Sequence, residues 1–157
     1  MEGVEIKPFV LTPQVLDFYC RTFPLLRKKG ILWLTTSISG PKIKSALLQM
    51  SERAKNAYFL VYVNKKICGH FGLAEISFEG KYARFGFCLL PSFFNKRGVF
   101  PKIMDFVLDY ARKKLSLKTI VVELPEKSFF QQSKLIEFFL NSGFVFSPDL
   151  THLWLKL

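Results

Sequence analysis

The chain has 157 residues, half of them hydrophobic, and a formal net charge of +11. This length predicts one domain over residues 1–157, with ample apolar material for a core. The start has no basic segment followed by an apolar one, and no run approaches the ~18 apolar residues that cross a bilayer, so we expect a soluble, cytoplasmic protein with no membrane partner.

The excess of positive charge indicates an anionic partner, such as a phosphate-rich cofactor, a nucleic acid or an acidic protein, although a solvated basic surface also explains it. The three cysteines, Cys20, Cys68 and Cys88, are widely spaced in apolar surroundings and form no CxxC motif. We expect buried, reduced thiols rather than disulfides. A metal site is not expected, since only His70 and His152 are available to assist the cysteines.

The first part of the chain predicts a strand and two helices. Residues 4–10 alternate weakly, and Pro8 confines this strand to an edge or an end. Thr12 and Pro13 have the pattern of an N-cap and a first helical position, and Pro24 is expected to stop the helix. Residues 25–40 are interpreted as a partly ordered connection. Gly40-Pro41 then opens a second amphipathic helix with an apolar face at Ile43, Ala46, Leu47 and Met50.

From residue 58 the hydrophobic period changes to two. Residues 58–63, 67–78 and 82–90 predict three strands joined by short turns, which is the pattern of an antiparallel meander. Gly69 and Gly72 interrupt the second of these strands and indicate a bulge or a close approach of two backbones.

A short basic turn with one glycine, residues 95–99, follows the meander. The next helix carries apolar residues at helical spacing, and Pro101 lies in its first turn, where a missing N–H costs little. Residues 118–124 predict a strand parallel to the last meander strand. A final helix begins after the capping-box residues Ser128 and Gln131 and ends at Gly143, and residues 144–146 and 152–157 complete the sheet.

The basic turn has the chemistry of a phosphate site. Amides in a first helical turn lack intrahelical partners, and the helix dipole adds partial positive charge there. Lys96 and Arg97 add two full charges. The run of cations at Arg112, Lys113 and Lys114 is explained by their favourable interaction with a helix C-terminus.

This order of elements resembles the GNAT N-acetyltransferase superfamily over essentially the whole chain. The resemblance implies an α+β fold in α/β/α layers, with a central mixed, mostly antiparallel sheet of six to seven strands and about four helices. It also implies acetyl-CoA, or another acyl-CoA, as the cofactor. In this family a glycine loop before a helix binds the coenzyme A pyrophosphate through backbone amides. Here that loop corresponds to Asn95, Lys96, Arg97, Gly98, Val99 and Phe100.

Phe100 stands where the family usually has Gly or Ala. A small residue lets phosphate approach the helix end, so a Phe either obstructs the loop or points into the core. Its register with Ile103, Met104 and Val107 favours the core.

Two further segments carry the resemblance. Residues 84–91 are similar to the family's fourth strand, which splays from the fifth so that the pantetheine arm bonds in the gap. The cofactor-binding positions implied there are Cys88, Leu89 and Leu90. Residues 137–144 are similar to the family's closing helix: Phe139 falls where a Tyr often protonates the leaving thiolate, and Gln132 falls where an Asn often contacts the cofactor. Arg84 falls where many members have a Glu base.

Acetyl transfer requires a deprotonated amine, a donor for the thioester carbonyl and a route for the proton. The proton acceptors that remain are Glu75, His70 and Tyr82; a solvated carboxylate, a satisfied imidazole and a packed phenol are their structural alternatives. Glu75 and His70 face opposite sides of a regular strand unless a bulge at Gly72 resets the alternation. A backbone N–H near Leu89 is implied as the carbonyl donor.

The leading hypothesis is therefore an N-acetyltransferase acting on a small-molecule or protein amine, with an anionic acceptor as one possibility. Its departures at Arg84, Phe100 and Phe139 leave a second hypothesis open: a catalytically degraded GNAT-like module that binds CoA or an anionic partner. A nucleic-acid binder is a distant third, because no recognised motif is present. A monomer or a homodimer is expected.

Overall fold

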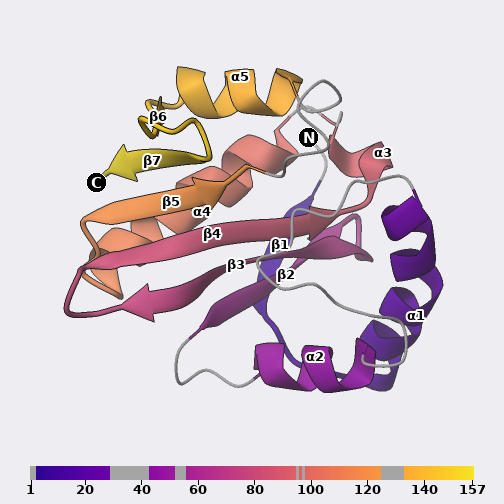
Figure 1. The fold of residues 1–157 in the computed structure, drawn as a ribbon. Helices are drawn as coiled ribbons and strands as arrows, with labels where there is room; N and C mark the ends of the chain where they lie inside the picture. Colours follow the sequence, from indigo (N-terminus) through magenta and orange to yellow (C-terminus); the bar gives the residue numbers. More distant parts are fainter. Residues whose placement is uncertain (1–2, 29–42, 52–55, 95, 97, 125–132) are drawn as a thin grey trace.

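The computed structural model describes residues 3–28, 43–51, 56–94, 96, 98–124 and 133–157 (Figure 1). Within these ranges it contains seven strands and five helices. The strands are β1 (Val4–Pro8), β2 (Ala57–Val63), β3 (Lys66–Ser77), β4 (Tyr82–Leu89), β5 (Thr119–Glu123), β6 (Val145–Phe146) and β7 (His152–Lys156). The helices are α1 (Pro13–Lys28), α2 (Ile43–Ser51), α3 (Pro91–Phe94), α4 (Val99–Lys113) and α5 (Ser133–Asn141).

All seven strands form one sheet in the order β1-β2-β3-β4-β5-β7-β6. Strands β2 to β4 pair antiparallel, as the period-two pattern predicts, and β1 pairs antiparallel with β2 at the edge to which Pro8 was expected to confine it. Strands β4 and β5 pair in parallel across α4. Strand β7 then pairs antiparallel with both β5 and β6. The expected mixed, mostly antiparallel GNAT-type sheet is confirmed.

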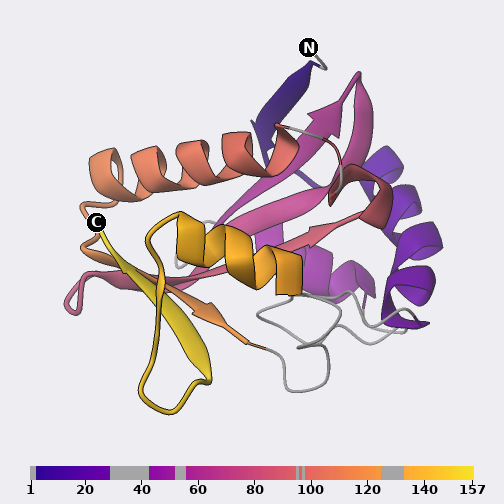
Figure 2. The same ribbon diagram turned by 90° about the horizontal axis from the view of Figure 1, so that it is seen from above.

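Two hydrophobic clusters lie on the two faces of the sheet. The larger cluster joins the sheet to α4 and α5 through residues such as Phe71, Ile103 and Phe139. The smaller one joins it to α1 and α2 through residues such as Tyr19 and Leu47. Alternation places successive residues of a strand on opposite faces, which is why Phe87 and Cys88 fall in different clusters. Figure 2 shows α4 and α5 apart from α1.

The N-terminal helix differs from its prediction at two points. Thr12 caps it as expected, because the Val15 amide donates to Thr12 Oγ1 at 3.3 Å. However, α1 continues past Pro24 to Lys28, so the predicted stop is wrong. Proline removes one backbone bond but fixes a helical φ, and Pro24 is exposed, where the loss is best tolerated. Cys20 is exposed on this helix, which corrects the expectation that all three thiols are buried.

Two irregularities shape β3. The register shifts where Val61 pairs with Gly69 and Tyr62 pairs with Ile67, so Cys68 is the extra residue of a bulge next to Gly69. Gly69 has φ +144, and a Cβ there would lie 2.0 Å from the Cys88 carbonyl oxygen, so the two backbones approach as the sequence indicated. A second shift follows Ala74, where Glu75 adopts a φ of +50.

The C-terminal elements largely follow their prediction. Helix α5 ends at Gly143, which has φ +94, and the Phe144 amide donates to the Phe139 carbonyl at 3.0 Å. Its proposed capping box, Ser128 and Gln131, lies outside the described residues. The one-turn helix α3 was not predicted. No helix in the described part of the chain is long and apolar enough to cross a membrane.

Candidate active site

The parallel pairing of β4 and β5 is short. It joins Tyr82 to Thr119, Ala83 to Ile120 and Arg84 to Val121, and it ends there. Strand β4 continues to Leu89 and leads into α3, past the end of β5 (Figure 1). Among the described strands, none pairs with this side of β4 beyond Arg84. In the described part of the chain, the stretch of β4 from Phe85 to Leu89 therefore offers a backbone edge on which an extended ligand can form hydrogen bonds.

The direction of the amides along this edge follows from one hydrogen bond. The Leu90 amide donates to the Cys68 carbonyl on β3 at 2.8 Å. Because N–H groups alternate in direction along a strand, the Leu89 amide points away from β3 and towards the unpaired edge. The donor that was expected near Leu89 is thus directed to the side where a thioester carbonyl would lie.

The glycine turn leads from this edge into α4. Gly98 is the N-cap residue in a left-handed conformation, with φ +91 and ψ −13. A Cβ added there would meet no described atom within 4 Å, so the space around Gly98 is open. The first turn of α4 contains no acidic residue to neutralise the positive end of the helix dipole. These features suit a phosphate.

Lys96 lies in the same turn and is half-buried, with Nζ 5.0 Å from the centre of the Phe93 ring. Burial raises the pKa of the nearby Cys68 thiol to about 12, and the Lys96 cation acts in the opposite direction. Lys96 therefore adds one positive charge to the turn that follows β4 and α3.

Phe100 does not obstruct the turn. Only 6% of its surface is exposed, and its ring packs edge-on against Phe87, Phe138 and Phe139 with centroid separations of 5.2, 4.9 and 5.7 Å. The residue that differs from the usual small one is thus a core residue, as its helical register indicated. Val99 beside it is also buried, so both act through packing and their backbone.

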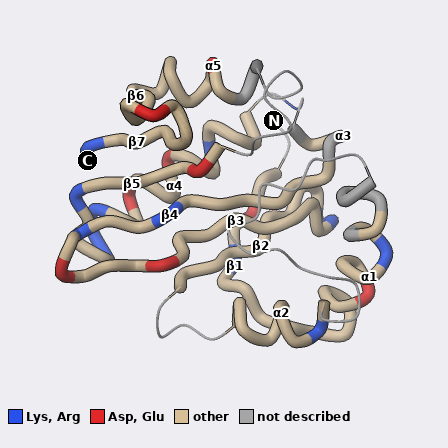
Figure 3. Tube along the Cα trace, viewed as in Figure 1, with Lys and Arg blue, Asp and Glu red and all other residues tan. Residues whose placement is uncertain are grey.

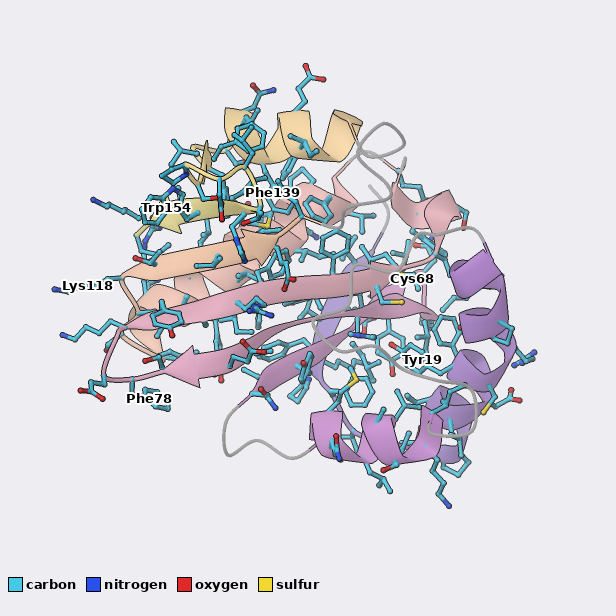
Figure 4. All side chains as sticks on the ribbon, in the orientation of Figure 1. Tyr19, Cys68, Phe78, Lys118, Phe139 and Trp154 are labelled. Carbon is cyan, nitrogen blue, oxygen red and sulfur yellow. The ribbon has the colours of Figure 1, made fainter. Side chains whose placement is uncertain are left out.

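Phe139 and Cys88 offer no titrating group at neutral pH. Phe139 is fully buried and contacts Phe85, Phe100 and Phe144, which leaves its position without a hydroxyl. Burial raises the pKa of Cys88 to about 12, so its thiol stays protonated. Figure 4 shows Phe139 beneath α5.

His70 is the one buried polar side chain in the described part of the chain. It pairs with Cys88 across β3 and β4, one residue from Leu89, so it is the nearest of the three candidate bases to the expected thioester. Its Nδ1 lies 2.6 Å from the Tyr19 hydroxyl of α1, and Phe9 and Tyr58 enclose the ring. Burial lowers the pKa of His70 to about 3, which makes it a weak base.

Glu75 and Tyr82 lie further along the sheet. Glu75 forms an ion pair with Arg84, which is five residues or about 16 Å along β4 from Leu89. Tyr82 is two residues further away, at about 23 Å, and is exposed. The structure therefore does not bring the three candidates together. The structure does place the Glu75 side chain on the same face of the sheet as Arg84 and His70. The register shift after Ala74 interrupts the alternation of side chains along β3.

Sequence reasoning missed the connection of Arg84 with two carboxylates. Besides Glu75, Arg84 forms an ion pair with Glu123 of β5 at 2.8 Å. Three of the predicted cofactor-binding residues, Asn95, Arg97 and Gln132, lie outside the described residues. In the described part of the chain, His, Cys, Asp and Glu form no group of three or more that could hold a metal ion.

This chain has the GNAT N-acetyltransferase fold. The features that define the fold are a β4–β5 pair that separates after a few residues, a glycine turn before a helix, and helices on both faces of the sheet. No model of a known protein family matches the sequence, and no curated protein matches it.

Solved structures match over nearly the whole chain. The N-acetyltransferase PseH of Campylobacter jejuni, in complex with acetyl coenzyme A, has a TM-score of 0.68 at 20% identity, over 98% of this chain and 99% of that one. A second PseH structure gives 0.66 at 22% identity, over 98% and 97%. Spermidine N-acetyltransferase of Vibrio cholerae, in complex with CoA and spermine, gives 0.73 at 16% identity, over 98% and 95%.

Proposed function

We propose that this protein is an N-acetyltransferase that moves an acetyl group from acetyl-CoA to an amine. The observation that carries the proposal is the position of the unpaired β4 edge, which runs by way of α3 into an open glycine turn and an α-helix N-terminus. The extended pantetheine arm of acetyl-CoA can form hydrogen bonds along the β4 edge, and its pyrophosphate can bind at the turn and the N-terminus of α4. The likeness to an acetyl-CoA complex of the same fold supports this assignment.

Each part of the site has a role in this reaction. The Gly98 amide and the charge of Lys96 bind the pyrophosphate, assisted by Asn95, Arg97 and Gln132. The Leu89 amide donates to the thioester carbonyl and makes its carbon more electrophilic. Acetyl-CoA supplies an activated acyl group; the amine nitrogen forms the new C–N bond as the C–S bond breaks.

Proton transfer relies on few groups. The amine must lose one proton, and the departing sulfur must gain one. Since Phe139 has no hydroxyl and His70 is a weak base, solvent carries out both transfers in this proposal, because Glu75 is about 16 Å along the sheet from Leu89. Direct attack by a neutral amine then predicts a rate that rises with pH until the acceptor amine is deprotonated.

The net charge of +11 favours an anionic acceptor over a polycation such as the spermine bound by the Vibrio cholerae enzyme. A phosphate-bearing small molecule with a primary amine is the first class to test. The protein acts in the cytoplasm as a monomer or a homodimer in this proposal.

A GNAT-like module that binds CoA without turnover is the second candidate. It is favoured by the buried Phe139 and the low pKa of His70, which together remove two conventional proton-transfer groups. The two candidates differ in one measurable step, the release of a free thiol.

The test combines calorimetry with a thiol assay. Titration of the protein with acetyl-CoA, and with CoA, is expected to show binding at one site. Incubation with acetyl-CoA and a panel of amines, both phosphorylated and unphosphorylated, is expected to release thiol only with some amines. Absence of binding at high acetyl-CoA concentration would end the proposal, and binding without thiol release from any amine would favour the module.

A further inference from the structure

Arg84 lies where the paired part of β4 ends. Its partner across the parallel pair is Val121, the last residue of β5 that pairs with β4. Its Nη1 is 2.8 Å from Glu123 Oε2 on β5, and its Nη2 is 3.3 Å from Glu75 Oε2 on β3. One guanidinium thus joins three neighbouring strands at the point from which the ligand edge runs. We call these three residues the three-strand clamp.

The backbone around Glu75 is arranged to bring its carboxylate there. Ala74 pairs with Arg84 and Ser77 pairs with Tyr82, so Glu75 and Ile76 together lie opposite Ala83 and β3 has an insertion of one residue. Glu75 adopts a left-handed φ of +50, and its amide donates to Asn56 Oδ1 at 3.3 Å. In a regular strand Glu75 would face away from Ala74 and Arg84. The insertion reverses this and completes the clamp.

The exposure of the three side chains fits a role for arginine in particular. The Arg84 side chain is 29% exposed, whereas those of Glu75 and Glu123 are 60% and 53% exposed. The guanidinium is therefore partly withdrawn from water between two strands. A guanidinium presents donors in several directions from one plane, so it binds two carboxylates on opposite sides, which a lysine ammonium does less well.

We propose that Arg84 is a positioning residue that holds β5 to β4 at the end of their pairing and so fixes where the ligand edge begins. The proposal rests on the proposed function for its effect on acetyl-CoA, but the clamp itself is independent of catalysis. Glu75 and Glu123 are the two anchors. Loss of the guanidinium lets the end of β5 separate from β4, which shifts the edge relative to the glycine turn.

The experiment compares Arg84→Met and Arg84→Lys with Arg21→Met. Arg21 is a matched control, because it forms an exposed ion pair with Asp17 within α1, away from the sheet. Amide hydrogen exchange followed by mass spectrometry reports on peptides covering β5 and, as a reference, β2. Steady-state kinetics report KM for acetyl-CoA and kcat separately.

For Arg84→Met we expect about tenfold faster exchange in β5 with unchanged exchange in β2, corresponding to about 1.4 kcal/mol of local opening. KM for acetyl-CoA rises several-fold, while kcat stays within twofold. Arg84→Lys falls between Met and wild type. Glu123→Gln, whose side chain is half in solvent, reproduces part of the β5 effect if Arg84→Met fails to fold.

The clamp proposal is overturned if exchange in β5 is unchanged in Arg84→Met and in Glu123→Gln, or if Arg21→Met accelerates it equally. A uniform acceleration across β2 and β5 also overturns it, because that pattern means general destabilisation. If the wild-type protein does not bind acetyl-CoA, the proposed function fails, while the exchange measurement still decides the clamp.

Discussion

Gly98 and Gly143 provide a matched pair of substitutions for the phosphate-binding turn. Both glycines have left-handed backbones, with φ of +91 and +94, but Gly98 begins α4 at the proposed site and Gly143 ends α5. Neither position is crowded: an added Cβ meets no described atom within 4 Å at Gly98, and meets Leu155 Cδ1 at 3.4 Å at Gly143. Replacement of either by Ala therefore tests backbone conformation with little steric conflict.

The expected stability loss is the same for both variants. A side chain in the left-handed region costs roughly 1–2 kcal/mol. For a chain of this size, 1 kcal/mol lowers Tm by about 2–4 °C, so each variant should melt about 2–8 °C below wild type. Thermal unfolding followed by circular dichroism measures this loss.

Binding separates the two variants. The new methyl group of Gly98→Ala occupies the open space in which a phosphate approaches the amides, so we expect acetyl-CoA to bind at least about tenfold more weakly, a loss of about 1.4 kcal/mol. Gly143→Ala should bind as wild type does. Calorimetric titration of each variant with acetyl-CoA, well below both melting temperatures, measures this difference in affinity. Equal affinities for the two variants would refute the assignment of the turn as the pyrophosphate site.

Three further predictions concern the buried groups. Tyr19→Phe removes the hydroxyl 2.6 Å from His70 Nδ1 and takes this hydrogen-bond partner from a buried ring nitrogen, so urea unfolding should show a loss of about 1–3 kcal/mol; a loss under about 0.5 kcal/mol would mean that the bond contributes little. The pKa of His70 is about 3 in the folded chain and about 6.5 when unfolded, so between these values the unfolded chain binds the additional proton and stability falls with decreasing pH, by up to about 1.4 kcal/mol per pH unit. Unfolding curves from pH 8 to pH 4 should show this slope in wild type and a slope smaller by one proton in His70→Gln; parallel curves would contradict the low pKa. Cys20 is exposed whereas burial raises the pKa of Cys68 and Cys88 to about 12, so a thiol reagent at neutral pH should modify one cysteine in the native protein and all three in denaturant. Rapid modification of more than one native thiol would show that the sheet opens.

Much of the fold was predictable because its signals are local. The period-two pattern of residues 58–90 sets which side chains are inside, and a slip by one residue would expose all of them, so the strands and their pairing follow directly. The orientation of Phe100 followed from its spacing to Ile103 and Val107 in the same way. Both predictions needed only a few neighbouring residues.

The predictions that failed depended on tertiary context. Proline is a strong local stop signal, yet α1, which packs on the sheet through Val15 and Tyr19, continues past Pro24 to Lys28. Cys20 has apolar neighbours in sequence but lies on the outward face of that helix. The three-strand clamp joins residues from β3, β4 and β5, and it depends on an insertion in β3 that no glycine marks. The spacing of charged residues in the sequence does not predict this clamp.

The basic character of the chain is also clearer in three dimensions. Figure 3 shows Lys and Arg at several loops and strand ends around the sheet, with few along its centre. The charges are therefore dispersed, with Lys96 in the turn before α4 and Arg84 where the unpaired edge of β4 begins. This dispersion agrees with long-range attraction of an anion more than with a single dedicated groove.

The burial of Phe100 has a consequence for how this sequence can change. Its ring is one member of an aromatic network with Phe87, Phe138 and Phe139. Truncation to the small residue usual at this position would open a cavity and cost about 3–5 kcal/mol, a large part of the roughly 5–15 kcal/mol that holds a typical domain folded. Replacement of Phe100 by Gly or Ala is therefore tolerated only after a neighbouring side chain has been replaced by a larger one. The order in which substitutions are made, as well as their summed effect on stability, thus decides which variants of this turn laboratory evolution can reach.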